Sequence, residues 1–295
     1  MTSRFIKLTS TFLALALVLA LAAASISCGE EGNASDKIGV AVTILPQAEF
    51  AESIGGDRIN VTVMVPPGTS PHTTELTPSQ MTEVAKARMY AKVGSGVEFE
   101  LAYMDKIKDV NKNMLIVDCS EGIELIGSVD PDEPGDDPHI WLSPANAEIM
   151  VQNICAGLVQ IDPNNKTYYE RNRDTYLEKL DSLDEEIKVK LENVQNRAFI
   201  VFHPSWGYFA RDYNLEQIPI EIGGKEPSAQ DVSQIIEEAK SRNIKIIFAS
   251  PQFNPQMAEV IAHEIGGNVV SIDQLAKDYI SNLQIVSNEM VEAME

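Results

Sequence analysis

Three of the four histidines in the chain lie in short segments of a kind that often binds ligands. His139 lies in a loop after an acidic run, four residues before Ser143-Pro144. This pair predicts a helix start, because serine caps a first turn well and proline suits the first helical position. His72 precedes a predicted capping box, Thr77 to Gln80, and His203 directly follows an apolar run. Loops beside regular elements commonly carry binding residues, so these three imidazoles are candidates for one shared site.

Two halves of the chain each show strands alternating with helices. Strands are predicted at Ile38–Ile44, Ile59–Val65, Met89–Val93, Met114–Val117, Ala198–Phe202, Gln217–Ile220, Ile244–Ala249 and Asn268–Ile272. Helices are predicted at Gln47–Ile54, Pro78–Lys86, Phe99–Val110, Ser205–Tyr213, Ala229–Arg242, Pro255–Ile265 and Asp278–Met294. This alternation predicts an α/β fold with parallel sheets covered by helices on both faces.

A segment of different character separates the halves. Asp162-Pro163 is typical of a helix start, and a helical pattern then runs without glycine or proline to about Val194. Its apolar residues recur at three- and four-residue steps and lie mostly on one face: Tyr169, Tyr176, Leu180, Leu183, Ile187, Leu191 and Val194. At 1.5 Å per residue, about thirty residues form a rod of about 45 Å. Its position indicates a backbone that joins the halves rather than one more surface helix. We therefore expect an N-terminal αβ lobe over residues 37–161, a connecting helix over 162–195 and a C-terminal αβ lobe over 196–295.

The predicted strands place the candidate residues near one edge of each sheet. His72, His203 and Asp273 each follow the carboxyl end of a predicted strand, and His139 precedes a helix start. Ligands of open parallel sheets bind at the carboxyl edge, and each half supplies two of these residues. The sequence therefore predicts a site between the lobes.

Three imidazoles and one carboxylate form a four-coordinate set that suits Zn²⁺. Affinity order alone does not separate Zn²⁺ from Cu²⁺, Ni²⁺ or Co²⁺, and Mn²⁺ more naturally requires a second carboxylate. Each residue also has a structural interpretation: His203 could pack among aromatic residues, and Asp273 could cap a helix. His263 begins the sequence His263-Glu264-Ile265-Gly266-Gly267, in which Gly267 stands where a metalloprotease motif has its second histidine. We interpret His263 as a surface residue.

The net charge of −21 argues against nucleic acid as a partner, because such a surface repels phosphates and attracts cations. Cys119 and Cys155 could form a disulfide or remain buried thiols.

The N-terminus has the features of a targeting segment. Two basic residues precede an apolar run from Phe12 to Ile26, which is short for a membrane span. Small residues before Cys28 predict a lipoprotein-type signal peptide over residues 1–27, with Cys28 as the lipidated first residue. The alternative is ordinary cleavage near Ala24. A polar tether over 28–36 follows, and either processing places the mature protein outside the cytoplasm.

Several motifs in one order resemble the metal-binding solute-binding proteins of ABC importers, zinc-uptake type. They are Val65-Pro66-Pro67-Gly68-Thr69-Ser70-Pro71-His72, Asp137-Pro138-His139-Ile140-Trp141-Leu142-Ser143-Pro144, Phe202-His203-Pro204-Ser205-Trp206-Gly207-Tyr208-Phe209, Glu226-Pro227-Ser228-Ala229, Pro251-Gln252-Phe253 and Asp273-Gln274-Leu275-Ala276. The resemblance covers essentially the whole mature chain.

The resemblance implies two lobes joined by one long rigid helix, with a metal in the cleft between them. It implies metal ligands at His72, His139, His203 and Asp273. Histidine at position 203 resembles the zinc branch, because manganese relatives usually carry glutamate there. Gln274 departs from the usual proline, which puts the presentation of Asp273 in doubt. The acidic loop at 130–137 stands where many zinc binders carry a long histidine-rich insert. It could collect cations weakly, but we interpret it as a solvated turn.

These features together predict a lipid-anchored, monomeric receptor that captures Zn²⁺ and delivers it to an ABC permease in the membrane. It would bind the ion without being an enzyme. The alternatives are the same receptor serving Mn²⁺ or Fe²⁺, a surface adhesin on this fold, and a zinc hydrolase with water as the fourth ligand.

Overall fold

The computed structural model describes residues 37–127, 135–221 and 227–294. The predicted signal peptide, Cys28 and the tether lie outside the described residues, as do Glu226 and most of the acidic loop. Among the described helices, none combines the length and the apolar character needed to cross a membrane.

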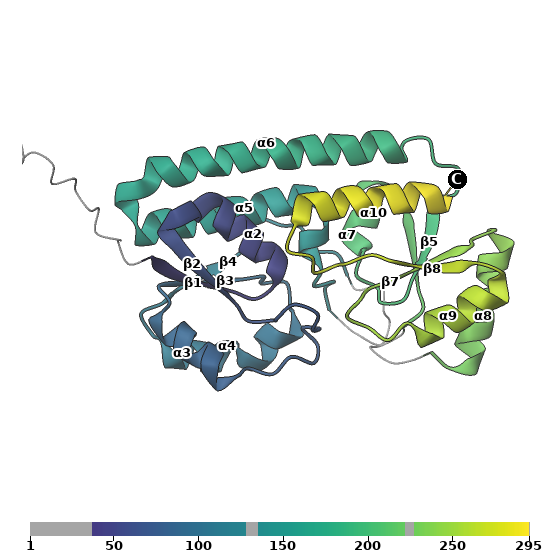
Figure 1. Ribbon diagram of the computed structural model, residues 1–295, viewed down its shortest axis with the longest axis horizontal. Coiled ribbons are helices and arrows are strands. Elements are labelled where there is room, and N and C mark those ends of the chain that lie inside the picture. The colour runs from purple at the N-terminus through teal and green to yellow at the C-terminus, as the bar shows by residue number, and fades with distance from the viewer. Residues whose placement is uncertain (1–36, 128–134, 222–226, 295) are drawn as a thin grey trace, which may run out of the picture. The chain divides into compact units, whose positions relative to one another are not determined.

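The first lobe is built on a parallel sheet in the order β2-β1-β3-β4. Its strands are β1 (Ile38–Val42), β2 (Ile59–Val63), β3 (Met89–Lys92) and β4 (Leu115–Asp118). Its helices are α2 (Leu45–Gly55), α3 (Pro78–Lys86), α4 (Glu98–Val110) and α5 (Pro144–Ile161), with 3₁₀ turns η1 (Gly56–Arg58) and η2 (Ile140–Leu142). In Figure 1, α3 and α4 cover one face of this sheet, while α2 and α5 cover the other.

The second lobe repeats this topology in the order β6-β5-β7-β8, again parallel. Its strands are β5 (Ala198–Val201), β6 (Glu216–Pro219), β7 (Ile246–Ala249) and β8 (Asn268–Ser271). Its helices are α7 (Gly207–Asp212), α8 (Ala229–Ser241), α9 (Gln256–Ile265) and α10 (Tyr279–Met294). The predicted α/β class with two four-stranded parallel sheets is confirmed.

A long helix, α6 (Lys166–Leu191), follows the 3₁₀ turn η3 (Pro163–Asn165) and runs beside both lobes (Figure 1). It packs on α2 and α5 of the first lobe and on α10 of the second. Its buried side chains are those of the predicted apolar face: Tyr169, Tyr176, Leu180, Leu183, Ile187 and Leu191. The long connecting helix is therefore confirmed, while the exact lobe boundaries stay predictions.

Apolar packing also joins the lobes directly. One buried cluster contains Phe50 of α2, Tyr176 of α6, Phe209 of α7 and Tyr279 of α10. The Phe50 ring lies edge-on to Tyr279, with ring centroids 5.0 Å apart. Burial of this kind stabilises the junction through the hydrophobic effect, so the lobes share a core.

Most predicted elements differ from the observed ones by a few residues at an end, and two of these differences have a hydrogen bond to a side chain at the boundary. β1 ends at Val42 rather than Ile44, because Thr43 donates its backbone N–H to Gln47 Oε1 (3.1 Å) at the start of α2. α7 begins at Gly207 rather than Ser205, because Trp206 donates its backbone N–H to Gln217 Oε1 (2.7 Å). In both cases a glutamine side-chain oxygen accepts the backbone N–H of a residue that was predicted to lie in a strand or a helix.

Cys119 and Cys155 are free, buried thiols. Burial raises the pKa of both, and both therefore remain protonated at neutral pH.

Candidate metal centre

The three predicted histidines meet between the lobes. The Nε2 atom of His203 lies 3.3 Å from Nε2 of His72 and 3.3 Å from Nε2 of His139. The three groups offer ligand atoms that all lie within 4.8 Å of one another. A tetrahedral ion with Zn–N bonds of about 2.0–2.1 Å holds neighbouring nitrogens about 3.3 Å apart. The spacing of the imidazoles therefore suits one small ion bound by all three.

His72 lies in the loop between β2 and α3, where local hydrogen bonds shape the backbone. Thr74 donates its N–H to Ser70 O (3.0 Å), and His72 donates its N–H to Ser70 Oγ (3.3 Å). The predicted capping box begins α3, since Gln80 N donates to Thr77 Oγ1 and Thr77 N donates to Gln80 Oε1. This loop therefore has one hydrogen-bonded turn that encloses the histidine and one fixed helix start after it.

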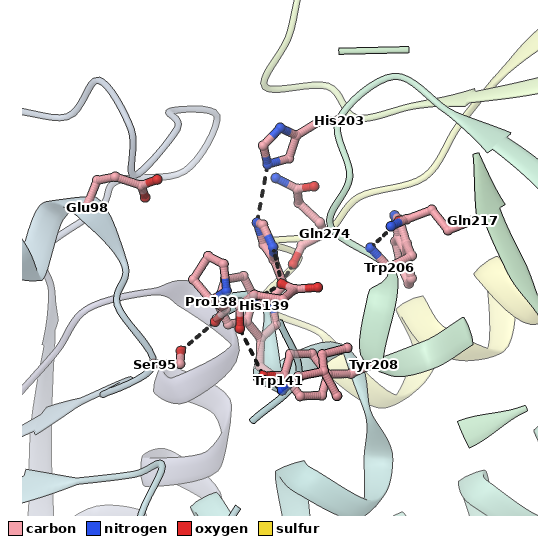
Figure 2. A network of polar contacts seen from close by, with 12 residues as sticks. Ser95, Glu98, Pro138, His139, Trp141, His203, Trp206, Tyr208, Gln217 and Gln274 are labelled. Carbon is pink, nitrogen blue, oxygen red and sulfur yellow. Dashed lines mark hydrogen bonds and ion pairs between the residues drawn. The ribbon is translucent and has the colours of Figure 1, made fainter. Parts of the chain in front are cut away.

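His139 is held by contacts from both lobes. Ser95 Oγ donates to Pro138 O (2.5 Å), and Tyr208 Oη from α7 donates to Asp137 O (2.9 Å). After His139, Ser143 accepts the N–H of Asn146 (3.1 Å) and begins α5 as predicted. Figure 2 shows His139 above Trp141 and facing His203. The His139 segment is therefore fixed on each side of the ligand residue.

His203 directly follows β5, the second strand in the sheet order of its lobe. Its ring stacks on Phe253, with centroids 4.7 Å apart. His203 therefore packs against an aromatic residue, as the structural interpretation predicted, and also belongs to the group of three histidines.

Each imidazole has a carboxylate at its outer nitrogen. The Nδ1 atom lies 2.8 Å from an oxygen of Glu98 for His72, 2.8 Å from Asp137 for His139 and 2.5 Å from Glu221 for His203. A neutral imidazole that donates from Nδ1 keeps a lone pair on Nε2, and such carboxylates commonly orient histidine ligands. The three carboxylates therefore direct three Nε2 lone pairs toward one point.

The charges around the centre favour a cation. The pKa of His203 is lowered to about 4, chiefly by burial; the hydrogen bond to Glu221 opposes the shift, and the charges of His139 and His72 contribute to it. His203 is therefore neutral and able to ligate at neutral pH. Burial tends to raise the pKa of Glu98, but its hydrogen bond and charge interaction with His72 outweigh this, so its pKa is lowered and it stays ionised.

Asp273 lies outside the group of converging ligand atoms. It follows β8 as predicted, and its Oδ1 accepts from Gln252 Nε2 (2.8 Å) and from the N–H of Leu275 (2.8 Å). The structure thus brings together three of the four predicted ligands, and the role of Asp273 as fourth ligand stays a prediction.

The acidic loop was only partly interpreted correctly from the sequence. Asp136 is exposed, but Asp137 is buried and accepts hydrogen bonds from two of the three nitrogens of His139, the backbone N–H (2.9 Å) and Nδ1 (2.8 Å). The interpretation of the loop as a solvated turn is therefore wrong for Asp137, because burial beside an imidazole outweighs the local polarity. Its place two residues before His139 was an available signal, whereas nothing in the sequence near Glu98 or Glu221 indicated a role. His263 is exposed on α9, as predicted.

Known proteins resemble this chain over most of its length. The family model for the zinc-uptake complex component A, periplasmic, matches residues 40–293. A high-affinity zinc uptake system protein of Bacillus subtilis is 31% identical, over 92% of this chain and 89% of its own. A manganese ABC transporter substrate-binding lipoprotein of Streptococcus gordonii is 30% identical, over 86% of this chain and 85% of its own. A zinc-bound crystal structure of a ZnuA deletion mutant is 42% identical and covers 88% of this chain and 99% of its own, with a TM-score of 0.84.

Proposed function

This chain belongs to the family of the zinc-uptake complex component A, periplasmic, and from that premise we propose that its three-histidine centre captures Zn²⁺ for an ABC importer. The protein is a substrate-binding receptor and not an enzyme. It binds the ion outside the cytoplasm and passes it to a membrane permease.

The arrangement of the three imidazoles is the observation that supports Zn²⁺ as the ion. Nε2 of His203 lies 3.3 Å from Nε2 of both His72 and His139, the three ligand atoms lie within 4.8 Å of one another, and each ring has a carboxylate at its Nδ1 atom. Nitrogen ligands at this spacing suit Zn²⁺, while Mn²⁺ prefers carboxylate, carbonyl and water oxygens. Within the same proposal, Mn²⁺ and Fe²⁺ are competitors that bind more weakly.

Binding proceeds by ligand exchange. The ion loses its water molecules as it gains His139, His203 and His72, and Asp273 or a water molecule completes the coordination. The shared core beside α6 opposes a large separation of the lobes, so release proceeds through movement of the loops that carry the ligands or through contact with the permease.

The proposal includes the rest of the predicted receptor. Residues 1–27 are removed, Cys28 carries the lipid and residues 28–36 tether a monomer to the outer face of the cytoplasmic membrane. Mass spectrometry of the membrane fraction tests this part, because a diacylated N-terminal Cys28 has a distinct mass.

Competition with a chromophoric zinc chelator tests the centre. The parent protein should withdraw Zn²⁺ from the chelator, and His139→Ala should lose most of this ability. His263→Ala is the matched control, because His263 is exposed and lies on α9 away from the cluster. Zinc binding by His139→Ala equal to that of the parent would exclude this site.

A further inference from the structure

The loop between β3 and α4 contacts two of the three histidine segments. Ser95 donates from Oγ to Pro138 O (2.5 Å), directly before His139 (Figure 2). At the other end of the loop, a side-chain oxygen of Glu98 lies 2.8 Å from Nδ1 of His72. One short loop therefore supports two of the ligand residues of the centre.

The backbone of this loop has little stiffness of its own. It turns at Gly94 and Gly96, whose φ angles are 90° and 99°. Glycine adopts such angles without steric strain and adopts many others as readily, so it does not by itself fix the direction of its neighbours. The positions of Ser95 and Glu98 therefore depend on how the ends of the loop are held.

Glu100 holds the two ends of the loop together. Its side chain is 6% exposed and extends from the first turn of α4 back to the end of β3. There Oε1 accepts the N–H of Val93 (2.6 Å) and Oε2 accepts the N–H of Gly94 (3.0 Å). The hydroxyl of Thr43 also donates to Oε1. Burial raises the pKa of Glu100, and these hydrogen bonds oppose the shift.

We propose that Glu100 is a positioning residue for zinc binding, because it closes the loop that holds Ser95 at the His139 segment and Glu98 at His72. This inference rests on the proposed function, since it assigns a further residue to the support of the same centre. A carboxylate suits the role because its two oxygens accept hydrogen bonds from two successive backbone N–H groups at once.

Glu100→Gln tests the role with little change of shape. It replaces one accepting oxygen by an NH₂ group, which cannot accept the backbone N–H that it faces. Zinc affinity, measured by competition with a chelator, should fall about fivefold because the loop is held less firmly. Thr43→Val is the matched control, since it removes a donor to the same carboxylate but leaves both backbone hydrogen bonds of the loop. It should lower the melting temperature and keep the zinc affinity of the parent.

A double-mutant cycle separates positioning from general destabilisation. In a protein that already carries Ser95→Ala and Glu98→Gln, the loop has lost both of the side chains that support the histidine segments. Adding Glu100→Gln to this protein should therefore leave its zinc affinity unchanged. An equal loss of affinity in both backgrounds, or parent-like affinity of Glu100→Gln alone, would overturn the proposal.

Glu100→Asp keeps the charge but withdraws the carboxylate from the loop by one methylene group. It should lose zinc affinity as Glu100→Gln does, and it provides the same test if Glu100→Gln does not fold. Parent-like affinity of Glu100→Asp would assign the effect to charge and exclude the proposed role. If the parent protein binds no Zn²⁺, the receptor proposal itself fails, whereas a parent that binds and Glu100 variants that match it refute only the role of Glu100.

Discussion

His139 and His72 bring the same chemistry to the metal centre from very different surroundings. Each presents Nε2 to the cluster and places Nδ1 2.8 Å from a carboxylate oxygen. The side chains of His139 and its partner Asp137 are 5% and 3% exposed, whereas those of His72 and its partner Glu98 are 23% and 39% exposed. His203 and Glu221 resemble the buried pair, at 7% and 12%.

Burial changes how much the same histidine–carboxylate contact contributes to the site. Water and salt screen an exposed charged pair, so such pairs contribute little, while loss of one partner from a buried pair leaves a polar group without compensation. We therefore expect the buried pairs to contribute most to the affinity for zinc and the exposed pair to contribute little. The more exposed His72 side is also where an arriving or departing ion meets solvent.

The largest effect is expected from Asp137→Asn. Loss of the buried carboxylate removes its charge and weakens the hold on His139, so zinc affinity should fall about 10- to 100-fold. Isothermal titration with Zn²⁺ measures this, and Asp136→Asn is the control because Asp136 is the exposed neighbour. An equal fall in both variants would show that net charge, rather than orientation of His139, governs binding.

Gly207→Ala should disturb the same pair without changing any charge. A Cβ at Gly207 would overlap Asp137 Oδ2 and crowd Ile126 Cδ1, so the short Asp137 side chain must move. Zinc affinity should fall roughly tenfold, and thermal unfolding should show a loss of about 1–3 kcal/mol. Gly127→Ala is the matched control, since a Cβ there meets nothing within 4 Å. Parent-like affinity in Gly207→Ala would show that the position of Asp137 is not critical.

The third prediction concerns pH and the buried His203. An unfolded histidine gains a proton near pH 6.5, while burial lowers the pKa of folded His203 to about 4. Between these values the unfolded state binds more protons, so the stability of the metal-free protein falls as the pH falls. From pH 7 to 5.5 this contribution is about 1 kcal/mol. Urea unfolding of the parent and of His203→Gln measures it, and an unchanged pH slope in the variant would contradict the assignment.

The smallest effect is expected from Glu98→Gln. The pair with His72 is partly exposed, so zinc affinity should fall at most about fivefold, and the loss should shrink further at high salt. Chelator competition at two salt concentrations checks both expectations. A loss of zinc affinity as large as that of Asp137→Asn would contradict the expectation that the exposed pair contributes less than the buried pair.

The sequence predicted the elements well where the signals are local. α3 occupies the predicted range Pro78–Lys86, because its capping box and proline act within one turn. The prediction of element ends was poorer where a backbone N–H donates to a side-chain amide oxygen, as at Thr43 and Trp206. The three histidines could be found because each lies beside a predicted strand end or helix start.

The sequence by itself determined the alternation of strands and helices, the apolar face of α6 and the identity of three converging imidazoles. These follow from periodicity and capping, which depend on neighbours along the chain. Only the tertiary structure decided which carboxylates hold His72 and His203, and that Asp137 is buried. The physical reason is distance along the chain, since His72 and His203 are 131 residues apart and His203 and Glu221 are 18 apart. Burial and hydrogen bonding at such separations arise from how the lobes pack, and no local pattern records them.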